Sequence, residues 1–289
     1  MLASNHLVEL LSERAAVHPE RLALHFVQDG DPVETRITYG ELHARARGVA
    51  AQLSARAARG ERALLLYPSG PEYVSALLGC FYAGIVAVPA YPPQSLQPRH
   101  VARIVAIARD ARPALLLTEQ ALLPALQAAQ QLIDDLRRVE LIATNAPELG
   151  TRRDFRPSVI RADELAMLQY TSGSTATPKG VMLTHANLMA NEVAIHDAFS
   201  IQPDDVIVSW LPLFHDMGLI GTLLQPLYAG VSAVLMAPQR FMASPRRWLE
   251  AVSRYGGTVS GAPDFAYRLC AQRVDPGGDN PLDLSSWLL

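Results

Sequence analysis

The segment Tyr170–Gly180 constrains the fold of this chain more than any other. Its sequence is Tyr-Thr-Ser-Gly-Ser-Thr-Ala-Thr-Pro-Lys-Gly, and apolar runs precede it at 165–169 and follow it at 181–183. This pattern predicts a strand, a loop and a second strand, with the loop at the end of a sheet. Hydroxyl and backbone N–H groups donate hydrogen bonds, glycine permits close approach, and lysine adds a positive charge. The loop therefore suits a polyphosphate.

Two other kinds of phosphate loop are excluded by their spacing. A P-loop has Gly before its lysine and Ser or Thr after it, whereas Pro178 and Gly180 flank Lys179 here. The Gly-x-Gly-x-x-Gly pattern of dinucleotide sites does not occur either. The remaining alternative is an ordinary Ser/Thr-rich surface turn. We favour phosphate binding because such a turn has no need of a lysine directly after a rigid Thr-Pro pair.

Composition indicates a globular protein without a nucleic-acid partner. The 289 residues are 49% hydrophobic and 18% charged, with a net charge of −3, so no basic face is expected. Cys80 and Cys270 lie in apolar surroundings and match no metal or redox spacing. We expect both to be buried, reduced thiols in a cytoplasmic protein. The first thirteen residues are charged and amphipathic, which predicts no signal peptide.

Two uncharged runs, 73–98 and 217–239, are long enough to cross a bilayer. Glycine and proline interrupt both runs, and each divides into a helix-length piece and a short β-rich piece at 85–89 or 231–236. A buried helix that leads to a buried parallel strand explains both runs, so we predict no membrane span.

Strand-like and helix-like patterns alternate along the rest of the chain. We predict strands at 23–28, 33–38, 63–67, 85–89, 114–118, 141–144, 206–210, 231–236 and 258–261, besides the two around the loop. We predict helices at 7–16, 39–58, 71–83, 100–111, up to 136, 184–196, 217–228, 245–255 and 265–273. Such alternation favours an α/β fold with mostly parallel sheets covered by helices.

Three segments of the chain resemble those of a known enzyme superfamily. Tyr170–Gly180 is similar to the phosphate loop of the adenylate-forming superfamily, which includes acyl-CoA synthetases, peptide-synthetase adenylation domains and luciferases. Two further segments, Trp210–Gly221 (Trp-Leu-Pro-Leu-Phe-His-Asp-Met-Gly-Leu-Ile-Gly) and Ser260–Tyr267 (Ser-Gly-Ala-Pro-Asp-Phe-Ala-Tyr), resemble the fatty acyl-AMP ligases. The resemblance covers the whole chain but only about the first half of such an enzyme. It implies two α/β subdomains of the large N-terminal domain, which we place at 1–185 and 186–289.

The resemblance also implies roles for the loop residues. Those expected to bind ATP, with Mg²⁺ as its companion, are Thr171, Ser172, Gly173, Ser174, Thr175, Thr177, Lys179 and Gly180. Lys179 would also act in catalysis by steadying the departing pyrophosphate. The chain departs from the family at Ala176, where glycine is usual. The added Cβ costs on the order of 1 kcal/mol or more if φ is positive there.

The second implied catalytic residue is His215, which follows a predicted strand. Open α/β sheets place ligand sites at strand ends, and the resemblance puts this side chain near the substrate carboxylate and the α-phosphate. A purely structural histidine is the alternative, and Asp216 could simply cap the helix that follows.

A fatty chain needs a long apolar pocket. The candidates for its lining are Met217, Gly218, Ile220, Gly221, Gly261, Ala262 and Phe265. Ordinary core packing is the alternative for all seven residues.

We therefore interpret the chain as the N-terminal part of a fatty acyl-AMP ligase that delivers its product to an acyl carrier protein for polyketide or lipopeptide synthesis. In the resembling enzymes, the adenine site, the hinge and the small C-terminal domain would follow Leu289. We expect little or no acyl-adenylate from the chain alone, because those groups stabilise the transition state. Two alternatives stay open: an acyl-CoA ligase, and a non-catalytic module that binds fatty acids.

Overall fold

The structure is a computed structural model that describes residues 4–27, 34–93, 95, 97–146, 155, 159–171, 178–275 and 281–289. The chain divides into two compact units, each with its own sheet. Unit 1 comprises Met1–Glu13 and Glu41–Met189, and unit 2 comprises Arg14–Gly40 and Ala190–Leu289. The α/β architecture expected from the alternating pattern is confirmed.

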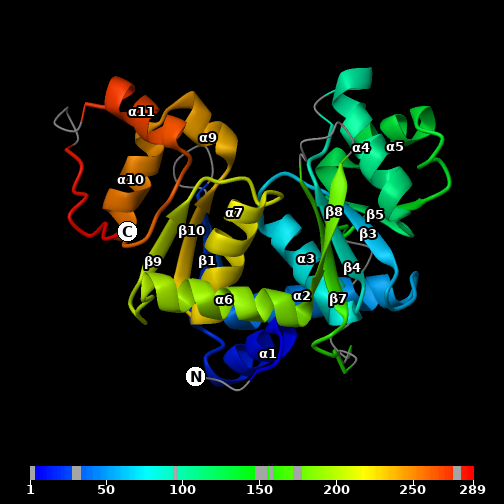
Figure 1. Cartoon of the computed structure of the whole chain (residues 1–289), viewed down its shortest axis with the longest axis horizontal. Helices are drawn as coiled ribbons and strands as arrows, with labels where there is room; N and C mark the ends of the chain where they lie inside the picture. Colours follow the sequence, from blue (N-terminus) through cyan, green and yellow to red (C-terminus); the bar gives the residue numbers. More distant parts are fainter. Residues whose placement is uncertain are drawn as a thin grey trace. The chain divides into compact units, whose positions relative to one another are not determined.

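Unit 1 is built on a six-stranded sheet (Figure 1). Its strand order is β6-β5-β3-β4-β7-β8, and only β8 runs antiparallel to its neighbour. The strands are β3 (Arg62–Leu66), β4 (Val86–Ala90), β5 (Leu115–Thr118), β6 (Glu140–Ala143), β7 (Leu165–Thr171) and β8 (Lys179–Thr184). The antiparallel pair β7–β8 is the strand–loop–strand predicted around the phosphate loop.

Helices cover both faces of this sheet. On one face, Ile104 of α4 and Leu126 of α5 pack against strand residues such as Leu64. On the other face lies α3, in which every residue from Tyr73 to Ala83 is buried. The helices are α2 (Tyr39–Ser54), α3 (Pro71–Ala83), α4 (Pro98–Ala111), η1 (Gln120–Leu122) and α5 (Leu123–Leu132).

Residues 73–90 of the first uncharged run are therefore core. Helix α3 ends at Gly84, whose φ of 68° is left-handed, and the chain turns there into the fully buried strand β4. Within the described residues, no helix is long and apolar enough to cross a membrane.

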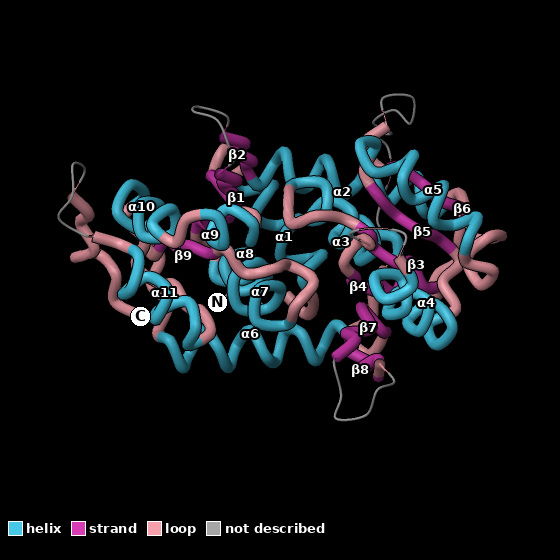
Figure 2. The backbone as a smooth tube through the Cα atoms, turned by 90° about the horizontal axis from the view of Figure 1, so that it is seen from above, coloured by secondary structure: helices cyan, strands magenta, loops and turns pink. Residues whose placement is uncertain are grey.

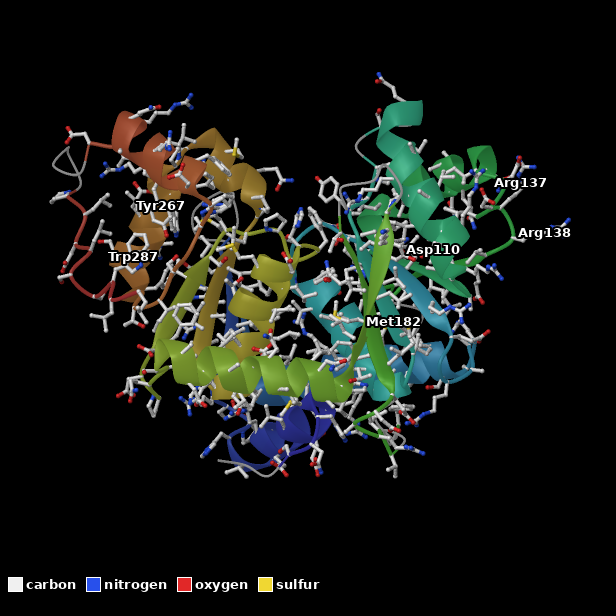
Figure 3. The ribbon with its side chains drawn as sticks, viewed as in Figure 1. Asp110, Arg137, Arg138, Met182, Tyr267 and Trp287 are labelled. Atoms are coloured by element: carbon white, nitrogen blue, oxygen red, sulfur yellow. The ribbon has the colours of Figure 1, made fainter. Side chains whose placement is uncertain are left out.

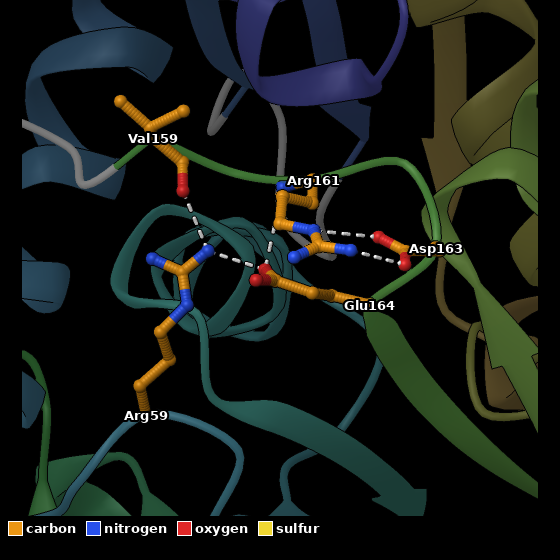
Figure 4. A network of polar contacts seen from close by, with 5 residues as sticks. All are labelled: Arg59, Val159, Arg161, Asp163 and Glu164. Atoms are coloured by element: carbon orange, nitrogen blue, oxygen red, sulfur yellow. Dashed lines mark hydrogen bonds and ion pairs between the residues drawn. The ribbon is translucent and has the colours of Figure 1, made fainter.

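A surface network ties the loop after α2 to the start of β7 (Figure 4). The Arg59 guanidinium donates to the Val159 carbonyl at 2.6 Å and forms an ion pair with Glu164. Arg161 donates two hydrogen bonds to the Asp163 carboxylate, at 3.0 and 2.7 Å. These contacts hold the segment that enters β7.

Unit 2 has a four-stranded sheet of order β2-β1-β10-β9. The strands are β1 (Leu22–Val27), β2 (Glu34–Thr38), β9 (Val206–Ser209) and β10 (Ser232–Met236), and only β2 is antiparallel. Strand β1 pairs with β10, so residues 14–40 belong with the C-terminal part of the chain. No local pattern signals a pairing between segments so far apart in sequence.

The two faces of this sheet are filled differently. Val208 of β9 points into a cluster with Trp248 and Phe241, whereas its neighbour Ile207 points to the opposite face, as strand alternation requires. Helices α10 and α11 lie on the aromatic side and α7 on the other, as Figures 1 and 2 show. The helices are α7 (Asp216–Leu219), η3 (Ile220–Leu224), α8 (Gln225–Ala229), α9 (Pro238–Ala243), α10 (Arg246–Tyr255) and α11 (Asp264–Arg273). Helices α1 (Leu7–Val17) and α6 (His185–Phe199) contribute residues to both units.

Three predicted elements need correction. The strand expected at 258–261 is a single bridge between Val259 and Ile207. The Ser260 N–H donates to the Leu289 carbonyl, and the Thr258 carbonyl accepts from the N–H groups of Leu288 and Leu289. The helix expected over 217–228 is interrupted by the π-helical turn η3. The helix expected to reach 136 ends at Leu132, since Ile133 has an extended backbone with φ −116° and ψ 101°.

Candidate functional site

The phosphate-loop hairpin stands at one edge of the unit 1 sheet. Thr171, the last residue of β7, pairs with Lys179, the first residue of β8, and both side chains are exposed. Gly180 follows directly and pairs with Tyr170. Lys179 is thus presented at a strand end, where a mobile cation can reach an anionic ligand. The expected loop residues Ser172, Gly173, Ser174, Thr175 and Thr177, together with Ala176, lie outside the described residues.

His215 and Asp216 open the helix that follows strand β9 in unit 2. His215 occupies the N-cap position of α7, its N–H donates to the Pro212 carbonyl at 3.1 Å, and its ring is exposed. The Asp216 carboxylate accepts the N–H of Met217 at 2.8 Å. Asp216 therefore stabilises the helix N-terminus, which accounts for its presence without a catalytic role. Lys179 and His215 belong to different units.

Gly218 is closely packed against the turn that precedes α7. A Cβ at this position would lie 2.4 Å from the Pro212 carbonyl oxygen and 3.1 Å from Cβ of Leu211. Only glycine permits so close an approach between the helix and the turn that precedes it. This close packing seats α7 against the turn that carries His215.

A cavity of about 430 Å³ lies entirely within unit 2, in the size range of small-molecule pockets. It lies on the Ile207 side of the sheet, between β9, the α7–η3–α8 segment and α6. Its lining is mostly apolar and consists of Asn191, Ile195, Phe199, Ile201, Ile207, Leu211, Asp216, Met217, Ile220, Gly221, Thr222, Gln225, Val259, Ser260, Gly261 and Leu289.

The cavity contains four of the seven residues expected to line a fatty-acid pocket. Met217, Ile220, Gly221 and Gly261 all line it, and Met217 Cε lies 3.7 Å from where a Cβ of Gly261 would stand. A Cβ at Gly221 would meet nothing within 4 Å, so this glycine leaves the space open. The π-helical turn η3, a feature common at functional sites, supplies Ile220, Gly221 and Thr222.

Ala262 and Phe265 lie elsewhere. Both pack with the aromatic cluster on the other face of the sheet, where the Phe265 ring centroid is 6.1 Å from that of Trp210. The structure does not place these two residues or Gly218 in the lining of this cavity, because adjacent positions in a turn or helix point to different surfaces. Their role in binding a fatty acid stays a prediction.

Sequence reasoning missed the wall contributed by α6. Asn191, Ile195 and Phe199 are spaced by four, which places them on one face of that helix. This spacing was visible in the sequence, but nothing there showed which surface the face would meet.

Three polar side chains of the cavity, Thr222, Ser260 and Gln225, are already engaged in hydrogen bonds. Thr222 Oγ1 donates to the Gly218 carbonyl at 2.7 Å, and Ser260 Oγ accepts from Trp248 Nε1 at 2.8 Å while donating to the Val208 carbonyl. With its amide oriented to satisfy its neighbours, Gln225 donates to the Glu192 carboxyl at 2.6 Å. An apolar chain can therefore occupy this space without leaving these groups unpaired.

Glu192, behind the cavity wall, is completely buried. Burial raises the pKa of its carboxyl group to about 9, so the group is neutral at pH 7. The cavity therefore carries no buried charge from this residue, and Asp216 is the one acidic residue in its lining.

Known proteins resemble this chain throughout. The AMP-binding enzyme family matches residues 11–288. A medium-chain-fatty-acid–[acyl-carrier-protein] ligase from Moorena producens is 41% identical, over 97% of this chain and 48% of that protein. A long-chain-fatty-acid–AMP ligase from Mycobacterium marinum is 36% identical, over 96% of this chain and 49% of that protein. The crystal structure of a fatty acid AMP ligase from Legionella pneumophila has a TM-score of 0.91 at 37% identity, covering 99% of this chain and 49% of that one.

The chain therefore belongs to the AMP-binding enzyme family. Within that family it matches the N-terminal part of the fatty acyl-AMP ligases, as the sequence motifs indicated. It spans about half the length of these relatives.

Proposed function

We propose that the protein is a cytoplasmic enzyme that activates a medium- or long-chain fatty acid with ATP and passes the acyl group to an acyl carrier protein. The observation that carries this proposal is the apolar cavity whose lining includes Asp216 and Met217, the two residues that follow His215. Two relatives support it: the M. producens protein is a ligase for medium-chain fatty acids and acyl carrier protein, and an L. pneumophila ligase has been solved in complex with acyl adenylate and pyrophosphate.

In this reaction a carboxylate oxygen of the fatty acid attacks the α-phosphorus of ATP, and the bond to the bridging oxygen of pyrophosphate breaks. The protein positions the reactants and stabilises charge. Lys179 would offset the growing negative charge on pyrophosphate. His215 would hydrogen-bond to the carboxylate or the α-phosphate, since its backbone is fixed at the N-cap and its ring is exposed.

Mg²⁺ enters the proposal as the companion of ATP. The described residues contain no group of three or more His, Cys, Asp or Glu side chains suited to a metal ion. Mg²⁺ commonly binds through substrate phosphates and one or two carboxylates, so ATP itself would carry it into the site. The chain's own contribution here is the positive charge of Lys179.

The test is detection of acyl-AMP by mass spectrometry after incubation with Mg-ATP and dodecanoate. The assay uses the 289-residue chain and, in parallel, a hybrid in which the second half of the M. producens relative follows it. Product that is lost in Lys179→Ala supports adenylation. Transfer to a carrier protein, as opposed to coenzyme A, is then read from which thioester forms.

A binding assay isolates the cavity from the nucleotide chemistry. Gly221→Val adds an isopropyl side chain to the cavity and should weaken dodecanoate binding by the chain about tenfold. Gly48→Ala in unit 1, where an added Cβ also meets nothing within 4 Å, serves as the matched control. Binding that persists without any acyl-AMP, and that Lys179→Ala leaves unchanged even in the hybrid, would favour the non-catalytic module.

A further inference from the structure

Helix α4 holds Tyr170, the residue directly before the end of β7. The Tyr170 hydroxyl donates to the Asp110 carboxylate, and its carbonyl accepts from the Arg103 guanidinium at 3.3 Å. Arg103 and Asp110 are seven positions apart, or about two helical turns, so they share one face of α4. Figure 3 marks Asp110 on this helix. The ring itself is buried in the core of unit 1.

Strand β8 also packs closely against the Tyr170 ring. A Cβ at Gly180 would lie 2.9 Å from Tyr170 Cζ and 3.1 Å from its hydroxyl oxygen, so only glycine fits. Tyr170 and Gly180 are also direct cross-strand partners, and the next pair is Thr171 with Lys179. The contacts to Tyr170 therefore act one residue away from the lysine that begins β8.

The hydroxyl remains a donor at physiological pH. Burial, together with its hydrogen bond to the Asp110 carboxylate, raises the pKa of Tyr170 far above the physiological range. In the link between α4 and the hairpin, the Tyr170 hydroxyl is therefore always the donor and the Asp110 carboxylate the acceptor. Such a charge-assisted hydrogen bond is one of the stronger kinds in proteins.

We propose that Asp110 and Tyr170 are positioning residues for the phosphate-binding hairpin: they tie its loop end to α4 and fix the direction in which Thr171 and Lys179 meet a polyphosphate. The backbone ladder between β7 and β8 sets the register, but a two-stranded edge can still twist at its open end. The link to α4 removes that freedom. This inference rests on the proposed function, because it assigns these residues to the same phosphate site.

The test compares Tyr170→Phe, Asp110→Ala and the double variant with the unaltered chain. Titration with inorganic pyrophosphate and Mg²⁺ should show about fivefold weaker binding in each single variant. The double variant should bind pyrophosphate no more weakly than the single variant with the lower affinity, because the two substitutions remove the same hydrogen bond. Tyr255→Phe is the matched control, because its hydroxyl donates to Glu34 in unit 2. It should bind pyrophosphate as the unaltered chain does.

A second readout does not depend on the ligand. Hydrogen exchange of peptides that cover 165–184 should be faster in Tyr170→Phe and Asp110→Ala than in the unaltered chain, and unchanged in Tyr255→Phe. Unchanged exchange together with pyrophosphate affinity within twofold would overturn the inference. If the unaltered chain and Lys179→Ala fail equally to bind pyrophosphate, the proposed function is in question, and hydrogen exchange alone decides whether the link orders the hairpin.

Discussion

Unit 1 and unit 2 each contain a sheet, but they differ in what covers its second face. In unit 1, α3 fills the space against the sheet and packs on α2, where a Cβ at Gly79 would lie 2.5 Å from Val49 Cγ1. In unit 2, the face that carries Ile207 borders a cavity, and a Cβ at Gly221 would meet nothing within 4 Å. A glycine therefore serves close packing in one unit and leaves room for a ligand in the other.

The acidic residues repeat this contrast. Glu192 in unit 2 is completely buried and neutral, whereas Glu164 in unit 1 lies at the surface with Arg59. The two carboxyl groups should therefore affect stability with opposite dependence on pH. Both contrasts can be tested by substitution.

The largest effect is expected for Gly79→Ala. The new methyl group would overlap Val49, a β-branched residue with little rotamer freedom in a helix. We expect the free energy of unfolding to fall by about 3 kcal/mol, measured by urea denaturation. In the control Gly48→Ala, on the neighbouring helix α2, the methyl group has open space and stability should rise by about 0.5–1 kcal/mol. Equal effects at both positions would show that α3 does not pack as described.

The glycines of the chain also show which features of the structure can be predicted from the sequence. The hairpin with Lys179 and the buried pair α3–β4 could be predicted, because their signals are local: hydroxyls and glycine between apolar runs, and a long stretch without charge. Gly218 and Gly221 could not be distinguished, although one packs against a carbonyl group and the other borders the cavity.

What decides between such residues is tertiary placement. The cavity depends on which face of α6 meets η3, and the unit 2 sheet depends on the pairing of β1 with β10 across about two hundred residues. No local sequence pattern indicates either contact. The fold class could therefore be predicted from the sequence, but most of the cavity lining could not.

The second largest effect is expected for Glu192→Gln, and it depends on pH. The folded-state pKa of Glu192 is about 9 against an ordinary 4.5, so the folded protein holds a proton that the unfolded chain releases. Stability from this group is full below about pH 4.5 and is lost as pH rises toward 9. Glu192→Gln has no titrating group at this position, so its stability does not fall with pH in this way. Between pH 5 and pH 8 its stability should improve relative to the unaltered chain by about 2 kcal/mol, a value that allows for relaxation around the buried group.

Thermal unfolding at several pH values measures this difference. Gln at position 192 keeps the shape of the carboxylic acid and can still pair with Gln225. Parallel stability curves for the two proteins from pH 5 to pH 8 would mean that the pKa of Glu192 is not raised in the folded state.

The smallest effect is expected for Glu164→Gln, and its dependence on pH has the opposite sign. Desolvation raises the pKa of Glu164, but hydrogen bonds from the Arg59 guanidinium and the Arg161 N–H outweigh it, so the pKa is lowered overall. The stabilisation from this carboxylate is therefore present at neutral pH and is lost as pH falls through its folded-state pKa, below 4.5.

The side chain of Glu164 is 31% exposed, so solvent and salt screen the pair. We expect Glu164→Gln to lower the free energy of unfolding by about 0.5 kcal/mol at pH 7, and by less at pH 4 or in 1 M salt. Asp163→Asn removes the neighbouring pair with Arg161, which is more exposed, and should cause no measurable change. A loss in Glu164→Gln that is equally large at pH 4 and pH 7 would show that the residue acts through packing, and the contrast between a surface charge in unit 1 and a buried neutral acid in unit 2 would then rest on Glu192 alone.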